Sequence, residues 1–223
     1  MVSQNEENKS IQKAIKRLFD IIVAFLAILV FLPIGVIITI LIKVTSSGPV
    51  FFVQERPGRH RKLFKVFKFR TMKKGSDKMV KGQEVMKDDE RITSIGRFLR
   101  RSKIDEIPQM LNILKGEMSL VGPRPERVAS LADYTEEIAK RLNVRPGLTG
   151  LAQVSGNIYI PLEERYKFDI YYVEHFSLWL DIRIILRTID VVLHGEGKFV
   201  DKCLVDMQGK IPVFTTEKET INL

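Results

Sequence analysis

The feature of this sequence that most constrains its fold is an apolar run at residues 21–42, interrupted only by Pro33, Gly35 and Thr39. As a straight α-helix at ~1.5 Å per residue, these residues would measure roughly 33 Å, which is enough to cross a bilayer. Length alone therefore favours a membrane segment, with a single spanning anchor as the simplest interpretation. The run exceeds the apolar core of a signal peptide, so we expect it to remain on the mature protein.

The proline and the flanking charges favour a different topology. Pro33 lacks an N–H group and its ring crowds the preceding turn, so a helix should bend or break at Leu32 and Pro33, and Gly35 softens the same point. Basic residues flank the run on both sides, with Lys16 before it and Lys43 after it, and the positive-inside rule keeps both ends cytoplasmic. A re-entrant helix that breaks at Leu32 and Pro33 satisfies both observations, and the spanning anchor is the alternative.

The positive charge is concentrated in one block. The chain of 223 residues has a net charge of +9, and residues 43–74 alone contain ten basic side chains and one acid. This balance favours anionic partners such as nucleotides, phospholipid headgroups or nucleic acid. A hydrophobic content of 45% with 28% charged residues excludes a disordered or fibrous chain. Cys203 is the single cysteine, which excludes an internal disulfide.

The segments after the apolar run predict a small mixed domain. Two β-prone runs at 49–53 and 63–70, joined by a turn-rich segment, predict a hairpin. Its alternating Phe and Lys residues suit nucleic acid or anionic lipid, and its position directly after a membrane segment favours lipid, so we expect no nucleic-acid partner. Residues 75–90 predict a loop over a site, and residues 94–101 a short basic helix.

We therefore expect an α+β fold that is predominantly helical, with a small β-hairpin. The predicted regions are a re-entrant membrane helix at 1–45, a cytoplasmic and interfacial catalytic domain at 46–197, and a tail at 198–223. The aromatic-rich segment 163–194 predicts amphipathic helices, which would lie in the membrane interface or pack in the core. The tail has no periodicity from which a structure follows.

Asp105 and Glu106 are the candidate catalytic residues. They begin a predicted helix that Ser102 or Asp105 would cap and that Gly116 would end. Carboxylates at a helix N-terminus are kept ionised by the dipole, which suits a nucleophile or a metal ligand, although helix stabilisation alone is the commoner reason for acids there. Basic residues nearby strengthen the catalytic interpretation: Arg100 precedes them, and the stiff segment Gly122-Pro123-Arg124-Pro125 would fix an arginine for phosphate contact.

Several segments together resemble the bacterial sugar transferase family, the monotopic phosphoglycosyl transferases. The resemblance runs from about residue 16 to about residue 197 and keeps the order and spacing of the motifs. They are SGPVFF (47–52), KFRTM (68–72), RITSIGR (91–97), DEIPQ (105–109), LKGEMSLVGPRP (114–125), VRPGLTG (144–150) and AQV (152–154).

The resemblance implies an enzyme on the cytoplasmic face of the bacterial inner membrane. It would transfer a phosphosugar from a UDP-sugar to undecaprenyl phosphate and release UMP, the first step in assembling a capsule, exopolysaccharide, O-antigen or glycoprotein glycan. Asp105 would be the nucleophile, forming a phosphosugar-aspartyl intermediate, and Glu106 would help to deprotonate the polyprenol phosphate. Mg²⁺ would assist at the diphosphate, with Asp105 as the candidate ligand. The re-entrant, proline-broken helix is also the family's arrangement.

The remaining site residues are carried over from the matching motifs. The predicted substrate-binding residues are Arg100, Pro123, Arg124, Pro125 and Gln153. Four positions depart from the family pattern: a serine is common at the position of Leu32, a tryptophan is frequent at Leu151, an asparagine at Ser155 and an arginine at Asn157. The sequence leaves open which UDP-sugar is used and whether the chain forms a homodimer. The rival hypothesis is a membrane-anchored basic protein that binds lipid or nucleic acid without catalysis.

Overall fold

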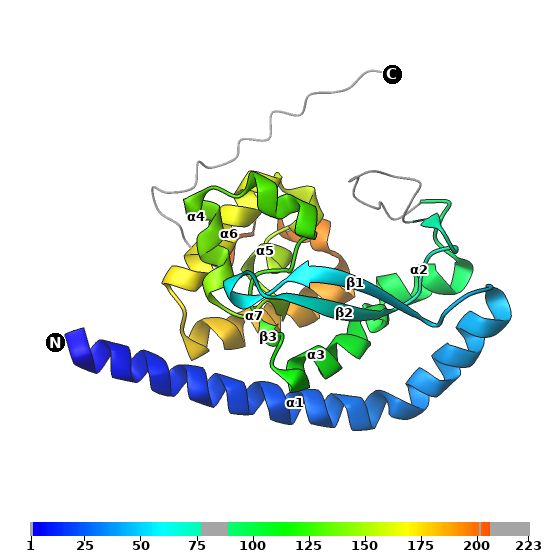
Figure 1. Ribbon diagram of the computed structural model, residues 1–223, viewed down its shortest axis with the longest axis horizontal. Coiled ribbons are helices and arrows are strands. Elements are labelled where there is room, and N and C mark those ends of the chain that lie inside the picture. Colours follow the sequence, from blue (N-terminus) through cyan, green and yellow to red (C-terminus); the bar gives the residue numbers. More distant parts are fainter. Residues whose placement is uncertain (1, 77–88, 201, 206–223) are drawn as a thin grey trace, which may run out of the picture.

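The computed structural model describes residues 2–76, 89–200 and 202–205, and side chains from residue 7 onward. The described chain is mostly helical, with two small two-stranded sheets (Figure 1). The helices are α1 (Val2–Thr45), α2 (Ser94–Arg101), α3 (Met110–Lys115), α4 (Glu136–Ala139), α5 (Leu151–Val154), α6 (Leu162–Glu174) and α7 (Leu178–His194). The strands are β1 (Phe51–Pro57), β2 (Leu63–Phe69), β3 (Ser119–Val121) and β4 (Gly147–Thr149). The predicted α+β class, predominantly helical with a hairpin, is confirmed.

The predicted hairpin is formed by β1 and β2. The two strands are antiparallel, with Phe51 opposite Phe69 at one end and Pro57 opposite Leu63 at the other. Alternation along β2 buries Phe64 and Val66 in the core. The second sheet was not predicted: β3 and β4 are parallel and only three residues long, too short to produce a periodic pattern.

Polar contacts attach α1 to the rest of the molecule along one side. The Arg17 guanidinium donates to the carbonyl oxygens of Ile113 and Leu114 at 2.7 and 3.0 Å, where the C-terminus of α3 has free acceptors. Asp20 is 2% exposed and accepts the backbone N–H of Leu120 at 3.0 Å. The first half of the helix is therefore bound to the folded domain by polar contacts as well as by its apolar face.

The apolar run lies within α1, and the helix continues through Pro33. Figure 1 shows the helix bending in its second half, as an internal proline should cause. The predicted break at Leu32 and Pro33 is therefore a bend within one continuous helix, and the re-entrant path stays a prediction. Residues 7–45 are long and apolar enough to cross a membrane, and only 11% of their most apolar window is buried.

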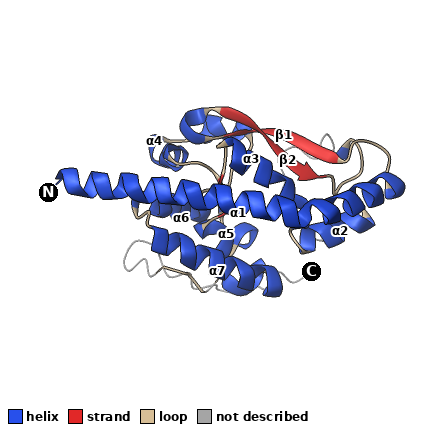
Figure 2. Cartoon of the chain, turned by 90° about the horizontal axis from the view of Figure 1, so that it is seen from below, coloured by secondary structure: helices blue, strands red, loops and turns tan. Residues whose placement is uncertain are grey.

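The two C-terminal helices differ in the face that they expose. In α6, Tyr166, Phe168 and Tyr172 are buried, so its aromatic residues pack in the core. In α7 the exposed apolar residues recur every three or four positions and make a stripe along one face: Trp179, Ile182, Leu186, Ile189 and Leu193. Figure 2 shows α7 on one side of α1 in the view from below, and Lys16 of α1 pairs with Asp181 in the first turn of α7 at 2.6 Å. The interfacial interpretation therefore fits α7 and not α6.

Two other predictions have different outcomes. The basic helix at residues 94–101 is confirmed as α2, and Thr93 caps it by accepting the Gly96 N–H. The loop predicted at 75–90 lies mostly outside the described residues, as does most of the tail after residue 198. The part of the tail that is described packs in the core through Phe199, Leu204 and Val205.

Asn112 connects the hairpin to α3, and we expect its loss to destabilise the fold. Its side chain is fully buried, donates to the Lys65 carbonyl at 2.7 Å and accepts the Phe67 N–H at 3.3 Å. Asn112→Leu leaves both backbone groups unpaired, which should cost on the order of 2–4 kcal/mol. For a chain of this size that corresponds to a fall in Tm of roughly 5–12 °C, measured by circular dichroism in detergent. Asn143→Leu, at an exposed position, is the matched control and should leave Tm nearly unchanged; equal shifts in both variants would contradict this role.

Candidate active site

Asp105 and Glu106 lie in the first turn of a 3₁₀ helix, η3 (Ile104–Gln109), which runs into α3. The sequence predicted one helix capped by Ser102 or Asp105, and both parts of that prediction are wrong. Lys103 is the N-cap residue, in the left-handed region at φ 58°, and no side chain caps the helix. Pro108 disfavours α conformation before it, which explains why the α-helix begins only at Met110. Gly116 ends α3 at φ 84°, as predicted.

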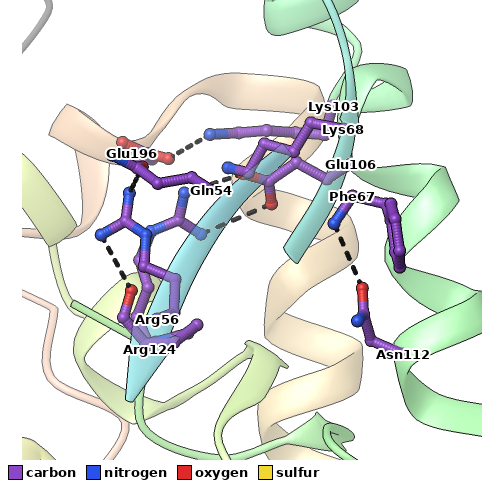
Figure 3. Close-up of polar contacts among 10 residues, drawn as sticks. Gln54, Arg56, Phe67, Lys68, Lys103, Glu106, Asn112, Arg124 and Glu196 are labelled. Carbon is purple, nitrogen blue, oxygen red and sulfur yellow. Dashed lines mark hydrogen bonds and ion pairs between the residues drawn. The ribbon is translucent and has the colours of Figure 1, made fainter. Parts of the chain in front are cut away.

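Glu106 is held between two cations from different parts of the chain. The Lys68 ammonium of β2 lies 2.6 Å from Glu106 Oε1, and Arg124 Nη2 lies 2.7 Å from the same oxygen (Figure 3). Burial alone would raise the pKa of Glu106, but the charges of Arg124 and Lys68 outweigh it and hold the pKa well below its usual range. Burial lowers the pKa of Lys68, partly offset by the Glu106 charge.

Asp105 differs from Glu106 in having no partner. Its side chain is buried, and no described residue donates a hydrogen bond to it or pairs with it. Burial and then the Glu106 charge raise the pKa of Asp105 to about 6, although Lys68, Arg100 and Lys103 act against that shift. We predicted that the helix dipole would favour ionisation, but burial outweighs it in this short 3₁₀ turn. The carboxylate still remains about nine-tenths ionised at pH 7.

Arg100 contributes unpaired positive charge beside Asp105. Its Nη1 atom is buried and has no hydrogen-bond partner among the described residues. Burial lowers the pKa of Arg100, and the charge of Asp105 opposes that effect. A guanidinium cannot release its proton at neutral pH, so a buried, unsatisfied N–H of this kind favours an anionic ligand. The charges of Arg100 and Asp105 therefore interact across the site, and the role of Arg100 in substrate binding stays a prediction.

Hydrogen bonds to the backbone of Arg124 and of its two neighbours hold this segment in place. Arg141 Nη2 donates to the Arg124 carbonyl at 2.9 Å, and Arg141 is itself buried in an ion pair with Asp169. The carbonyl of Pro123 accepts the Gly147 N–H at 2.9 Å. Pro125 accepts a hydrogen bond from Arg56 Nη1 at 3.4 Å. The two prolines, predicted as substrate-binding residues, flank Arg124 and constrain its backbone.

Gln153 is buried in α5, and both polar atoms of its amide lack a partner among the described residues. It makes no hydrogen bond to Asp105 or Glu106, so the structure does not join it to the acidic pair. Asn157, which departs from the family pattern, is buried at φ 50°, a conformation that asparagine tolerates better than most residues.

Lys68 and Lys103 are the site residues that our sequence analysis did not select. Lys68 lies on the core-facing side of β2 with Phe64 and Val66. A lysine at a core-facing position of an amphipathic strand is unusual, and this pattern could have indicated a functional role for Lys68. Lys103 pairs with Glu196 at 2.6 Å, across 93 residues of sequence (Figure 3). No local pattern could have indicated that contact.

The side chains around Asp105 could hold a metal ion only if substrate or water supplied the other ligands. The described residues contain no group of three or more His, Cys, Asp or Glu side chains that could hold a metal. The Glu106 carboxylate already accepts hydrogen bonds from Lys68 and Arg124. Asp105 is therefore the carboxylate of this pair that is available to bind a metal ion. Mg²⁺ is commonly held by one or two carboxylates together with substrate phosphates and water, and Asp105 fits that arrangement.

We expect the raised pKa of Asp105 to be directly measurable. In protein labelled with ¹³C at aspartate Cγ, one resonance should titrate near pH 6 and disappear in Asp105→Asn, which separates it from Asp169, whose pKa burial also raises to about 6. Glu106→Gln removes a neighbouring negative charge and releases Lys68 and Arg124, so the Asp105 midpoint should fall. A midpoint near 4 in the unmodified protein, or a rise in Glu106→Gln, would contradict the described electrostatics.

Comparison with known proteins agrees with the motifs at this site. The family model described as bacterial sugar transferase matches residues 11–195. An uncharacterised sugar transferase, EpsL of Bacillus subtilis, is 42% identical over 183 residues, covering 82% of this chain and 89% of EpsL. The undecaprenyl-phosphate galactose phosphotransferase of Salmonella typhimurium is 38% identical over 211 residues, covering 88% of this chain. A UDP-glucose:undecaprenyl-phosphate glucose-1-phosphate transferase of Escherichia coli is 40% identical over 188 residues, covering 80% of this chain.

The relatives differ in length. This chain aligns with most of EpsL, but it spans only 44% of the Salmonella protein and 40% of the Escherichia coli protein. The matched region includes α1 from residue 11 onward, the acidic pair of η3 and the Arg124 segment. Because the family model covers well over half of its residues, the chain belongs to the bacterial sugar transferase family.

Proposed function

We propose that this protein transfers a phosphosugar from a UDP-sugar to undecaprenyl phosphate and releases UMP. Relatives about 40% identical are named as undecaprenyl-phosphate sugar phosphotransferases, which supports the reaction class. Their names specify galactose, N-acetylgalactosamine or glucose, so the proposal covers the class and not one sugar. The product would begin assembly of a surface glycan.

The unpaired carboxylate of Asp105 is the observation on which the proposal rests. An oxygen of Asp105 would attack the phosphorus that carries the sugar, form an acyl phosphate bond and break the bond to the UMP phosphate. A phosphate oxygen of undecaprenyl phosphate would then attack the same phosphorus and release the aspartate. A covalent intermediate divides one difficult displacement into two easier ones. Asp105 suits this role because it is ionised at neutral pH and has no competing hydrogen bond among the described residues.

Fixed cations would stabilise the charge that develops on the phosphoryl oxygens. Arg100 has a buried guanidinium nitrogen without a described partner, and Lys103 also acts electrostatically on Asp105. Preorganised charges of this kind require no reorganisation during the reaction. Mg²⁺ bound at Asp105 and the diphosphate would supply further charge neutralisation.

Glu106 would act mainly through its partners. The family resemblance assigns it to deprotonation of the polyprenol phosphate, and that role stays a prediction. With its pKa held well below the usual range, the carboxylate is a weak base while Lys68 and Arg124 remain bound to it. We propose that its principal role is to hold those two cations in position.

The acceptor would reach this site from the bilayer. Undecaprenyl phosphate is a lipid, and the exposed apolar faces of α1 and α7 provide a surface that can lie on or in a membrane. By the positive-inside rule, the basic segment, and the catalytic domain with it, would lie on the cytoplasmic face of the bacterial inner membrane.

We expect Asp105→Asn to abolish UMP release. The amide cannot act as the nucleophile, so turnover with UDP-sugar, undecaprenyl phosphate and Mg²⁺ should fall at least about 10³-fold. Asp133→Asn, at an exposed position, is the matched control and should retain activity. Mass spectrometry of enzyme quenched with donor alone should detect a phosphosugar on Asp105. Persistent turnover in Asp105→Asn would refute the assignment, and a protein that binds membranes but never releases UMP would support the non-catalytic alternative.

Labelling from the two sides of sealed vesicles should test the path of α1. With Cys203 replaced by serine, a cysteine introduced at position 3 should react with an impermeant maleimide only from the cytoplasmic side if the helix is re-entrant. A cysteine at the exposed position 133 reports the side of the catalytic domain. Labelling of position 3 from the periplasmic side, with position 133 cytoplasmic, would establish the spanning alternative instead.

A further inference from the structure

A second concentration of positive charge lies away from Asp105, in a hollow of about 90 Å³ beside α1. Its charged lining comes from α1, from η1 (Arg59–Arg61) in the hairpin turn, and from the segment before β4. These lining residues are Lys13, Lys16, Arg17, Asp20, Arg59 and Arg145. Five cations therefore surround one acid.

The acid and two of the cations have partners that fix their positions. Lys16 pairs with Asp181 of α7 at 2.6 Å, and Arg17 donates to the end of α3. The single lining acid, Asp20, accepts the N–H of Leu120 through Oδ1. These contacts form a fixed frame around the hollow, and Asp20 and Asp181 offset only two of the five positive charges.

The other three cations have unused donors. Arg145 donates from Nε to the Gly116 carbonyl at 2.8 Å, and its two terminal nitrogens make no further hydrogen bond to described residues. The side chains of Lys13 and Arg59 make neither a hydrogen bond nor an ion pair within the described chain. Each of these side chains presents N–H groups that an anion could accept.

The cations are close enough to repel one another. Burial, followed by the charges of Arg17 and Arg59, lowers the pKa of Arg145. A guanidinium does not lose its proton at neutral pH, so the repulsion is relieved only by solvent or by a bound anion. Arginine donors of this geometry bind phosphate oxygens well.

We propose that this hollow binds the phosphodiester headgroup of an anionic membrane phospholipid. Its position on α1 favours a lipid over a soluble phosphate, because Lys13 and Arg17 lie among the exposed apolar residues Ile11, Ile15 and Leu18, directly before the apolar run at residues 21–42. Basic residues that precede an apolar helix lie at headgroup depth. The half-buried Phe176 adds an apolar wall to the same hollow.

The headgroup site is separate from the proposed active site. Arg17 and Arg145 contact the C-terminal end of α3 and Gly116, whereas Asp105 lies at the start of η3. The helical rise of η3 and α3 together is roughly 20 Å, so one phosphate cannot occupy both places. Lipid binding at the headgroup site therefore does not depend on the transfer reaction at Asp105.

Lipid retention by the full-length protein tests this site. The protein is placed in nanodiscs of phosphatidylcholine with one quarter phosphatidylglycerol, and the phosphatidylglycerol that remains bound is counted by native mass spectrometry. At about 1 kcal/mol for each cation removed, Lys13→Gln with Arg59→Gln should reduce retention by at least about tenfold. The matched control, Lys9→Gln with Arg61→Gln, removes the same charge from the same two elements at positions that do not line the hollow, and it should retain the lipid.

Three outcomes would overturn the proposal. Equal losses in both double variants would show that only net charge attracts the lipid, while retention in both would show that the hollow does not bind it. Displacement of the lipid by millimolar inorganic phosphate would assign the hollow to a soluble anion instead. Far-ultraviolet circular dichroism is used to check that both double variants are folded. A loss of lipid retention in a folded variant then reports on the headgroup site itself.

Discussion

The bridge of Glu106 to Lys68 and Arg124 is the interaction on which the site depends. It joins β2, η3 and the proline-flanked segment around Arg124, three parts of the chain with no local reason to meet. Because all three groups are buried in whole or in part, removing one partner would leave an uncompensated charge in a poorly solvated place, which costs far more than loss of a surface ion pair. The same bridge keeps Glu106 occupied and leaves Asp105 without a partner.

The chemistry of the two adjacent carboxylates follows from that asymmetry. Glu106 is stabilised as an anion by close cations, whereas Asp105 experiences burial and the Glu106 charge with no hydrogen bond from described residues to offset them. Neighbouring acids whose environments move their pKa values in opposite directions are typical of sites that assign different roles to similar side chains. One carboxylate positions cations and the other is available to react.

The N-terminal helix is part of the folded domain and is also long and apolar enough to cross a membrane. Arg17 and Asp20 bind backbone groups of the domain, and Ile38 and Ile42 pack with Phe69 and Leu99 near η3. Beyond these contacts, most of the apolar side chains of α1 are exposed. The helix can therefore bring the acidic pair to a bilayer surface in a defined orientation, which the proposed transfer from a soluble donor to a lipid acceptor would require.

The sequence alone determined the features that arise locally: the long apolar helix, the hairpin, the basic helix before the acidic pair, the glycine end of α3, and, through ordered motifs, the family. Tertiary structure decided the rest, because charge interactions depend on distance and burial. It placed Lys68 and Arg124 on Glu106, raised the pKa of Asp105 where the helix dipole predicted the reverse, and continued α1 through Pro33. It also brought Arg59 and Arg145 together beside Arg17, which no sequence spacing indicates.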